Sequence, residues 1–560
     1  MPVLNWIGKE AVVKHHKEVP FRLLEPEQDF SCDPSTTPSA ETAATPPNQG
    51  GEPQNLIVEG DNLLALKALL PRYAGKVKCI YIDPPYNTGN EGWAYNDNVK
   101  SPEIKKWLHQ VVGGEGETLD RHDRWLCMMY PRLVLLKQFL REDGVILISL
   151  DDVELGVLKC LMDEIFGKSK CLGTVVWNTR NTDNRIKTFL SPDHEYILVY
   201  GSSFDSRIEG RVIDRSDFKN PDNDARGPYV TDPLTGKATA EERPNLHAYN
   251  MQQPGTENVW RPDPAHGWIT DKDGYNDLLN ENRIWWPPNA RSGKPRKKRF
   301  LSETKERMPA STFWPEFRSF SGAAAVDDIL GDRVFPFPKP VQLVQRIIDY
   351  CAPKDSIVLD SFAGSGTTGH AVLKQNAEDG GNRRFILVEM DTNIAQNVTA
   401  ERVRRVSQGY INARGENVAG LGGGFQYCRL SDEPLFDSSG AIRSTVTFRE
   451  LAEFVWFMET GSGMRSAERG VLNEEGSPYL GTHNCRAVFL LYNGILKDRS
   501  DIGGNVLNGR TLEYVDSLLR DFKGERVVYG ARTRFDKKKL TALNITFHQL
   551  PYDLATKTWF

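Results

Sequence analysis

The sequence predicts an α/β fold built on a doubly wound, largely parallel sheet. Short apolar runs alternate with segments of helical periodicity, and acidic residues follow several of the runs, among them Asp61, Asp83 and Asp360. Continuous apolar runs suit strands that are covered on both faces, and intervening helices connect such strands in parallel. Open sheets of this kind bind their ligands at the carboxyl ends of the strands. We therefore expect the three acids to mark a site.

Composition indicates a soluble, cytoplasmic protein. The chain has 560 residues, of which 39% are hydrophobic and 26% charged, and this length allows two to four domains. No apolar run reaches the roughly 18 residues that a membrane span requires, and the start of the chain does not resemble a signal peptide. The eight cysteines are scattered without a Cys-x-x-Cys pair, which argues against a disulfide framework and predicts no metal site.

Changes in composition divide the chain into five predicted segments. They are an N-terminal extension with a mobile loop (1–54), a first half of the sheet (55–201), an irregular insertion (202–334), a second half of the sheet (335–424) and a small α/β domain (425–560). We expect the last segment to mediate protein contacts or dimerisation. A polar loop is also expected over residues 87–120, since loops of such length are usually functional or mobile.

A stiff acidic turn ends the strand at residues 80–82. Its residues are Asp83, Pro84, Pro85 and Tyr86, and the two prolines cannot donate to a strand ladder. Asp83 and the carbonyl of Pro84 can each accept a hydrogen bond from one exocyclic amine, while Tyr86 offers a face on which a base can stack. The arrangement suits the amino group of a base taken out of its helix. A strand-ending turn without a function is the alternative.

A second turn, rich in glycine, follows the strand at residues 356–360. Gly364, Gly366 and Gly369 open a helix whose first N–H groups are free to bind an anion such as a carboxylate. The same spacing, with Glu389 ending the next strand, also fits a nicotinamide dinucleotide site in which the acid binds a ribose. A Walker phosphate loop is excluded, because no Gly-Lys-Ser/Thr follows the glycines.

The insertion carries the densest basic run of the chain. Basic side chains that lie among tryptophans fit contact with the phosphates and bases of DNA. The six residues of the run are Arg291, Lys294, Arg296, Lys297, Lys298 and Arg299. A solvated loop is the alternative, and because the net charge of the chain is −5, any DNA-binding surface must be local.

These motifs resemble those of the amino-group DNA methyltransferases. Asp83-Pro84-Pro85-Tyr86 resembles their motif IV, in the form that points to adenine N6, whereas cytosine-N4 enzymes more often begin the motif with Ser. Residues 360–368 resemble motif I, and Lys339-Pro340 with the following helix resembles motif X. The order of the motifs is that of the permuted β class. Further similarity, to the modification (Mod) subunits of type III restriction systems, lies in residues 87–90, 95–97 and 378–385.

The resemblance implies a seven-stranded methyltransferase sheet, S-adenosylmethionine as cofactor and double-stranded DNA as substrate. Residues 55–201 then form the catalytic half, 202–334 the target recognition domain and 335–424 the cofactor half. The catalytic residues are Asp83, Pro84, Pro85 and Tyr86. Those that bind the cofactor are Asp61, Lys339, Asp360, Phe362, Ala363, Gly364, Gly366, Thr367, Thr368 and Glu389.

The resemblance also gives individual roles to three cofactor residues. Asp61 approaches the adenine of the cofactor, Lys339 its carboxylate, and Asp360 is linked through water to its ammonium. For Asp61, a role next to the start of a helix is equally well supported by the sequence. Asp360, and an acidic turn that has no obvious part in hydride transfer, favour S-adenosylmethionine over a nicotinamide cofactor.

The expected partners follow from the same family. We expect a homodimer, with a separate restriction and translocase subunit or other defence-system proteins as further partners, and no association with a membrane. Two other functions stay open at this point. One is an NAD-dependent enzyme, and the other is a non-catalytic DNA-recognition subunit.

Overall fold

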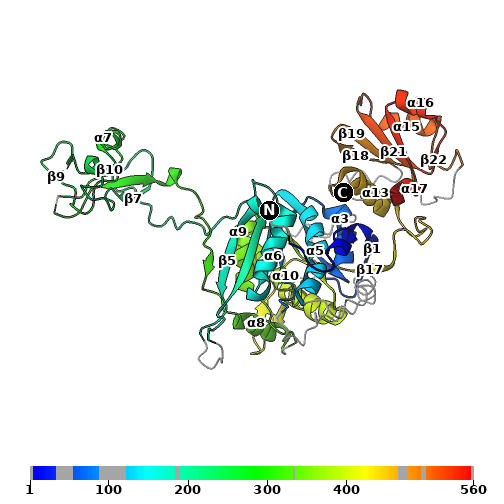
Figure 1. Ribbon diagram of the computed structural model, residues 1–560, viewed down its shortest axis with the longest axis horizontal. Helices are drawn as coiled ribbons and strands as arrows, with labels where there is room; N and C mark the ends of the chain where they lie inside the picture. The colour runs from blue at the N-terminus through cyan, green and yellow to red at the C-terminus, as the bar shows by residue number, and fades with distance from the viewer. Residues whose placement is uncertain are drawn as a thin grey trace. The chain divides into compact units, whose positions relative to one another are not determined.

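The computed structural model of the chain divides into two compact units. The main unit comprises Met1–Ile208 and Ser311–Phe560, and the second unit comprises Glu209–Ala310; Figure 1 shows the elements of both. The structure describes residues 4–32, 55–87, 121–182, 189–289, 291–331, 334–464, 477–492 and 500–556. The loop predicted at 33–53, and all but the first residue of the loop predicted at 87–120, lie outside these ranges.

The main unit is built on a ten-stranded sheet. Its order is β1-β17-β2-β14-β13-β3-β4-β6-β5-β12, and the seven neighbouring strands from β2 to β5 form the doubly wound sheet that the sequence predicts. Their bounds are Leu56–Glu59 (β2), Arg384–Glu389 (β14), Ile357–Asp360 (β13), Val77–Ile82 (β3), Leu140–Leu150 (β4), His194–Gly201 (β6) and Cys171–Asn178 (β5). Six of these seven strands run in the same direction, and β6 runs in the opposite direction. The predicted α/β fold class is confirmed.

Three further strands extend this sheet at its edges. β17 (Gln426–Pro434) pairs in parallel with β2, and β1 (Arg22–Pro26) pairs antiparallel with β17. At the other edge β12 (Phe313–Trp314) pairs with β5. β12 falls within the predicted insertion and β17 within the predicted C-terminal segment. Added strands of this kind pair backbone groups that an open edge would leave unpaired.

Alternate residues of the central strands face two layers of helices. In β3, Ile80 and Ile82 belong to one buried cluster, whereas Cys79 and Tyr81 belong to the other, as a strand period of two requires. Helices in contact with the first cluster are α3 (Asn62–Tyr73), α5 (Arg121–Phe139) and α6 (Asp152–Met162). Those in contact with the second are α9 (Val341–Cys351), α10 (Thr367–Asp379) and α12 (Glu401–Gln408).

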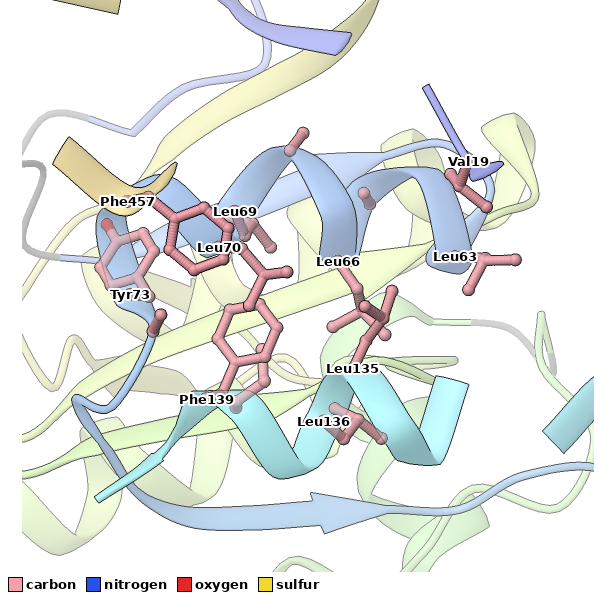
Figure 2. Packing of buried hydrophobic residues seen from close by; sticks show 14 of the residues in the cluster. Val19, Leu63, Leu66, Leu69, Leu70, Tyr73, Leu135, Leu136, Phe139 and Phe457 are labelled. Atoms are coloured by element: carbon pink, nitrogen blue, oxygen red, sulfur yellow. The ribbon is translucent and has the colours of Figure 1, made fainter. Parts of the chain in front are cut away.

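Packing of α3 on α5 holds the first layer together. Asp61 caps α3, because its Oδ1 accepts hydrogen bonds from the backbone N–H groups of Leu63 and Leu64 at 2.9 and 3.1 Å. Further along the helix, leucines recur at helical spacing and are buried. Figure 2 shows Leu66 of α3 meeting Leu135 of α5, and both side chains are almost completely buried.

The second unit has a core of its own. Its three-stranded sheet has the order β10-β11-β7. The bounds of its elements are Tyr229–Pro233 (β7), Met251–Gln252 (β8), Val259–Trp260 (β9), Lys272–Asn280 (α7), Ile284–Trp285 (β10) and Arg296–Phe300 (β11). Trp260 and Trp268 are buried in its hydrophobic cluster. This part is thus less irregular than predicted, because strands of two to five residues leave too little alternation to recognise in a sequence.

The C-terminal part of the main unit contains the small α/β arrangement that the sequence predicts. Its sheet has the order β18-β19-β21-β23. The elements are α13 (Phe448–Thr460), β18 (Tyr479–His483), β19 (Arg486–Leu490), α15 (Gly509–Leu518), β21 (Glu525–Gly530), α16 (Lys537–Ala542) and β23 (Ile545–Gln549). α13 packs on α3, where Arg72 Nε lies 2.6 Å from Glu453 Oε2. No helix in the described ranges is long and apolar enough to cross a membrane.

Smaller elements complete the main unit. They are α1 (Lys9–Val12), α2 (His15–Glu18), α8 (Phe320–Leu330), α11 (Thr392–Ile394), β15 (Gly409–Ile411), β16 (Asn417–Ala419), β20 (Val506–Leu507), β22 (Arg532–Thr533) and α17 (Tyr552–Thr556). Of these, α1 and α2 contact α5, and α8 contacts α12 and α9. The N-terminal segment is thereby packed on the first layer of helices.

Leu66→Ala is expected to lower the free energy of unfolding by about 2–5 kcal/mol, because a fully buried side chain is removed and a cavity remains. Urea denaturation followed by circular dichroism measures the loss. Leu172→Ala is the matched control, since Leu172 on β5 is 42% exposed and a change of about 0.5 kcal/mol or less is expected there. Equal losses in the two variants would contradict the packing described for α3 and α5.

Candidate active site

The two turns singled out in the sequence lie at neighbouring strand ends. β3 and β13 pair in parallel, with Leu359 opposite Ile80, so Asp83 and Asp360 emerge at the same edge of the sheet. β14 lies on the far side of β13, and β4 on the far side of β3. The strand order therefore reverses between β13 and β3, which is the switch point where open α/β sheets bind ligands. Two of the three acids that were expected to mark a site therefore lie at the ends of paired strands.

Three charged side chains meet at the acidic turn. Lys339 Nζ lies 3.1 Å from Asp83 Oδ1 and 3.3 Å from Glu195 Oε2. The hydroxyl of Tyr86 donates to the same Glu195 oxygen at 2.9 Å, and Lys339 Nζ lies 4.6 Å from the centroid of the Tyr86 ring. The side chains of Asp83, Glu195 and Lys339 are 25%, 24% and 12% exposed. The turn thus presents two carboxylates and one ammonium, all partly shielded from water.

Burial sets the protonation of these groups. It raises the pKa of Asp83; the ammonium of Lys339 opposes this shift and the Glu195 carboxylate adds to it, leaving the pKa above its ordinary value. Burial lowers the pKa of Lys339, but Asp83 and Glu195 outweigh it and raise that pKa overall. Burial also raises the pKa of Tyr86 well above its usual range. Lys339 is therefore charged and Tyr86 is a neutral donor, while Asp83 ionises at a higher pH than a free aspartate.

Hydrogen bonds from two helices fix the acidic turn. The indole Nε1 of Trp125 on α5 donates to the carbonyl of Pro85 at 2.7 Å. Asn87, whose φ is 59°, donates through Nδ2 to Glu154 Oε1 on α6 at 2.5 Å. His122 Nδ1 lies 2.7 Å from the same oxygen, and the Glu154 side chain is fully buried. Asn87 thus lies in the left-handed region, which asparagine adopts more readily than most residues, and these bonds fix it there.

Two buried carboxylates hold the glycine turn in shape. Asp360 accepts a hydrogen bond from the N–H of Phe362 at 3.0 Å and another from the Thr368 hydroxyl at 2.5 Å. Glu389, at the end of β14, accepts one from the N–H of Gly364 at 2.8 Å. Gly364 has a φ of 50°, in the left-handed region that favours glycine. Burial raises the pKa of Asp360 to about 7, although its two hydrogen bonds oppose the shift.

Arg402 on α12 supports the glycine turn from the protein interior. Its guanidinium is fully buried, and Nη1 donates to the carbonyl and the hydroxyl of Ser365 at 3.0 and 2.8 Å and to the Thr367 hydroxyl at 3.0 Å. Burial lowers the pKa of Arg402 to about 10, so the side chain remains charged at neutral pH. A charged donor with three bonds to this turn makes the turn rigid.

The glycine turn fits a ligand that carries both an ammonium and a carboxylate. Ser361 Oγ is buried beside Asp360 and has no hydrogen-bond partner in the part of the chain that the structure describes, and a buried hydroxyl of this kind calls for a partner. The ring of Phe335 lies so close to Gly364 that a Cβ there would come within 3.0 Å of it. Such residues fit S-adenosylmethionine, with a carboxylate at Asp360 for its ammonium and a free hydroxyl and helix start for its carboxylate.

Two of the predicted cofactor residues have other partners in the structure. Asp61 caps α3, and its Oδ2 lies 3.3 Å from Arg132 Nη2, so the helix-start alternative is confirmed. Lys339 lies at the acidic turn, on Asp83. The remaining predicted cofactor residues all belong to the glycine turn or its support. Phe362, Ala363, Gly366, Thr367 and Thr368 are buried in it.

The basic run of the second unit is divided between core and surface. β11 places Lys298 inward, where Nζ lies 2.5 Å from Asp222 Oδ2 and 3.2 Å from Asp224 Oδ2. The prediction that Lys298 binds DNA is therefore wrong, because its ammonium is buried and neutralised within the unit. A strand period of two explains this, since every second residue of β11 faces the core.

The other members of the run are more accessible. Arg299 pairs with Asp232 at 2.8 Å, and Arg296 Nε donates to the Thr231 hydroxyl at 2.8 Å. Arg291, Lys294 and Lys297 are exposed or half-buried and form no ion pair that involves the described residues. These three residues, the exposed basic group, are the ones that remain suitable for contact with DNA.

The fold and the two turns together define a class of protein. A doubly wound sheet with an acidic turn and a glycine turn at its switch point is typical of an enzyme that transfers a group from a nucleotide-bearing cofactor. The model of the DNA methylase family matches residues 77–401 of this chain. The chain belongs to that family.

Three characterised relatives are similar over most of the chain. The StyLTI Mod subunit, of a type III restriction-modification enzyme from Salmonella typhimurium, is 32% identical over 71% of this chain and 60% of its own length. The EcoPI Mod subunit of Escherichia phage P1 is 32% identical over 69% of this chain and 63% of its own. The type II methyltransferase M.KpnI of Klebsiella pneumoniae is 32% identical over 60% of this chain and 80% of its own length.

The predicted resemblance to type III modification subunits is confirmed by these comparisons. The chain nevertheless spans less than two thirds of the length of the two Mod subunits, at 60% and 63%. The alternative of an NAD-dependent enzyme is set aside, because the matched family comprises DNA methylases.

Four residues that serve the two turns were not predicted. They are Trp125, Glu154, Glu195 and Arg402. The sequence offers a weak signal for Glu195 alone, as an acid directly before the apolar run that forms β6. The other three lie in helices whose periodicity does not distinguish them from ordinary core or surface residues.

Asp360→Asn is expected to make the free energy of unfolding less dependent on pH. The folded protein keeps the proton of Asp360 up to a pH of about 7, whereas an unfolded chain releases it near 3.8. Stability is therefore lost as the pH rises between these values, by an amount on the order of 4 kcal/mol. Urea unfolding without cofactor measures the free energy of unfolding at about pH 5 and about pH 8. Between these two pH values it should fall by roughly 2–3 kcal/mol more in the wild type than in the variant. Equal losses would argue against the raised pKa.

Proposed function

We propose that this chain methylates the N6 amine of adenine in duplex DNA, with S-adenosylmethionine as the methyl donor. The observation that carries the proposal is the position of the Asp83–Pro84 turn beside the Asp360 glycine turn, at the ends of two paired strands. One turn suits an exocyclic amine, and the other suits the amino-acid end of the donor. The Asp form of the acidic turn favours adenine over cytosine.

The acidic turn orients the amine. Asp83 and the Pro84 carbonyl each accept one of its hydrogens, which aims the nitrogen lone pair toward the glycine turn. The ring of Tyr86 supports the base by stacking, worth roughly 1–3 kcal/mol. A base inside a duplex cannot reach this turn, so the target adenine must leave the helix. Positioning of this kind supplies most of the rate acceleration.

The remaining residues hold the donor and manage one proton. Asp360, Ser361 and the start of α10 would hold its ammonium and carboxylate, and Glu389 would bind its ribose. When bound, S-adenosylmethionine supplies a methyl group on a positively charged sulfur, so no covalent enzyme intermediate is needed. The amine loses one proton when its nitrogen gains the methyl group. Asp83 is hydrogen-bonded to that amine and is 25% exposed, so it can pass the proton to water.

We further propose that the chain acts as the modification component of a restriction system. Its similarity to Mod subunits supports this assignment, and a restriction and translocase subunit would then be its partner. A homodimer and a role of the C-terminal α/β part in protein contacts belong to the same proposal. The second unit would read the DNA sequence, with the exposed basic group of Arg291, Lys294 and Lys297 on the phosphates.

Asp83→Ala is expected to abolish methyl transfer and leave cofactor binding nearly intact. The variant loses the acceptor that orients the amine, whereas the glycine turn keeps its own hydrogen bonds to Asp360 and Glu389. Transfer of a tritiated methyl group to unmethylated DNA measures the activity, and calorimetry with S-adenosylhomocysteine measures the binding. Asp152→Asn is the control, because this exposed acid follows the neighbouring strand β4. Full activity of Asp83→Ala would refute the proposal.

Replacing the exposed basic group with glutamine is expected to weaken DNA binding and to reduce its dependence on salt. Removing one phosphate interaction lowers the slope of log K against log salt by about 1, so the triple variant should lose up to about 3. Fluorescence anisotropy with labelled duplex DNA at several salt concentrations gives the slope. Lys237→Gln is the control, because it removes the charge of an exposed lysine in the same unit. Equal slopes in the wild type and both variants would exclude the exposed basic group from the DNA interface.

A further inference from the structure

Lys339 occupies the place of an amine at the acidic turn. Its ammonium lies 3.1 Å from Asp83 Oδ1 and faces the Tyr86 ring at 4.6 Å. These two groups are the ones that the proposed function assigns to the target base, the carboxylate to its amine and the ring to its face. A base that enters this site must therefore take over contacts that Lys339 makes in its absence.

Glu195 gives the ammonium a second place to bind. β6 runs antiparallel to β4, so the first residues of β6 lie at the same edge of the sheet as Asp83. Glu195 Oε2 lies 3.3 Å from Lys339 Nζ and accepts the hydroxyl hydrogen bond of Tyr86 at 2.9 Å. Because Lys339 has two carboxylates at nearly equal distance, a small shift away from Asp83 exchanges one ion pair for the other without leaving the charge unpaired.

We propose that Lys339 and Glu195 are a positioning pair for the target amine. Lys339 holds the Asp83 carboxylate in place until the base enters, and then yields its position by moving onto Glu195. The inference rests on the proposed function and assigns Lys339 to the acidic turn in place of the cofactor carboxylate. The amine of the base then replaces the ammonium as donor to Asp83, and the Tyr86 ring exchanges a cation for a base.

The charges around Asp83 determine the direction of each expected effect. The groups that face it are Lys339 before α9, Glu195 on β6, Tyr86 in its own turn, Tyr81 on β3 and Asp360 on β13. Lys339 is the one cation in this set. Removing that cation leaves Asp83 beside acidic groups and makes it harder to ionise, whereas removing the charge of Glu195 makes it easier.

Lys339→Met separates the proposed role from binding of the cofactor. Methionine keeps much of the apolar stem and removes the charge. The affinity of the full chain for S-adenosylhomocysteine, measured by isothermal titration calorimetry, is expected to stay within about twofold of the wild type. A loss of about tenfold or more would assign Lys339 to the cofactor and overturn the inference. Lys354→Met is the matched control, since this exposed lysine precedes β13 at the opposite edge of the sheet.

The pH dependence of kcat/KM for DNA methylation is the second readout. In Lys339→Met the acid limb should move to higher pH by roughly 1–3 units. In Glu195→Gln it should move to lower pH, and kcat should fall, because the ammonium then has no second carboxylate to bind. Glu378→Gln is the charge-matched control, since this exposed acid lies near the far end of α10. A purely structural role would lower activity at every pH without moving the limb.

The double variant Glu195→Gln/Lys339→Met completes the test. Its acid limb should lie between those of the single variants, because the two charge changes offset each other. Limbs that move in the same direction, or not at all, in an active enzyme would overturn the inference. A wild type without methylation activity would instead count against the proposed function, and the calorimetric result would still decide where Lys339 acts. The two failures are therefore distinguishable.

Discussion

Parallel pairing of β3 with β13 is the constraint on which the site depends. The two strands are far apart in the sequence, yet their pairing brings Asp83 and Asp360 to one edge of the sheet. Other parts of the site take their position from the same sheet, Glu195 through β6 and Glu389 through β14. A slip of one residue would turn the side chains of β3 to the opposite face, so register and chemistry are fixed together.

Local patterns explain what could be predicted. An apolar run, two prolines and a spaced set of glycines identified the strands and both turns, because each of these features acts on its own neighbours. Glu195 and Arg402 escaped prediction, since each serves a turn that lies far away in the sequence. The basic run was only partly predictable, because alternation along β11 buries Lys298 beside aspartates that the sequence places some 75 residues earlier.

The two turns differ in the burial of the residues that hold them. The acidic turn is held by Trp125 and Glu154, which leave its open side to a charged network that water can reach. The glycine turn is held by fully buried groups, Asp360, Glu389 and Arg402. A site that must admit a base from a large polymer needs one adaptable wall, and a site for a small molecule gains from a rigid one. The distribution of burial agrees with that division.

The position of β13 has a consequence for synthesis of the chain. This central strand follows the second unit in the sequence, and its neighbour β3 precedes it. While a ribosome is still translating the insertion, β3 has one row of backbone groups with no strand to pair with, and β1 waits even longer for β17. Pairings between such distant segments form slowly, and open edges recruit other chains. Pauses in translation within the insertion therefore expose a half-built sheet to aggregation.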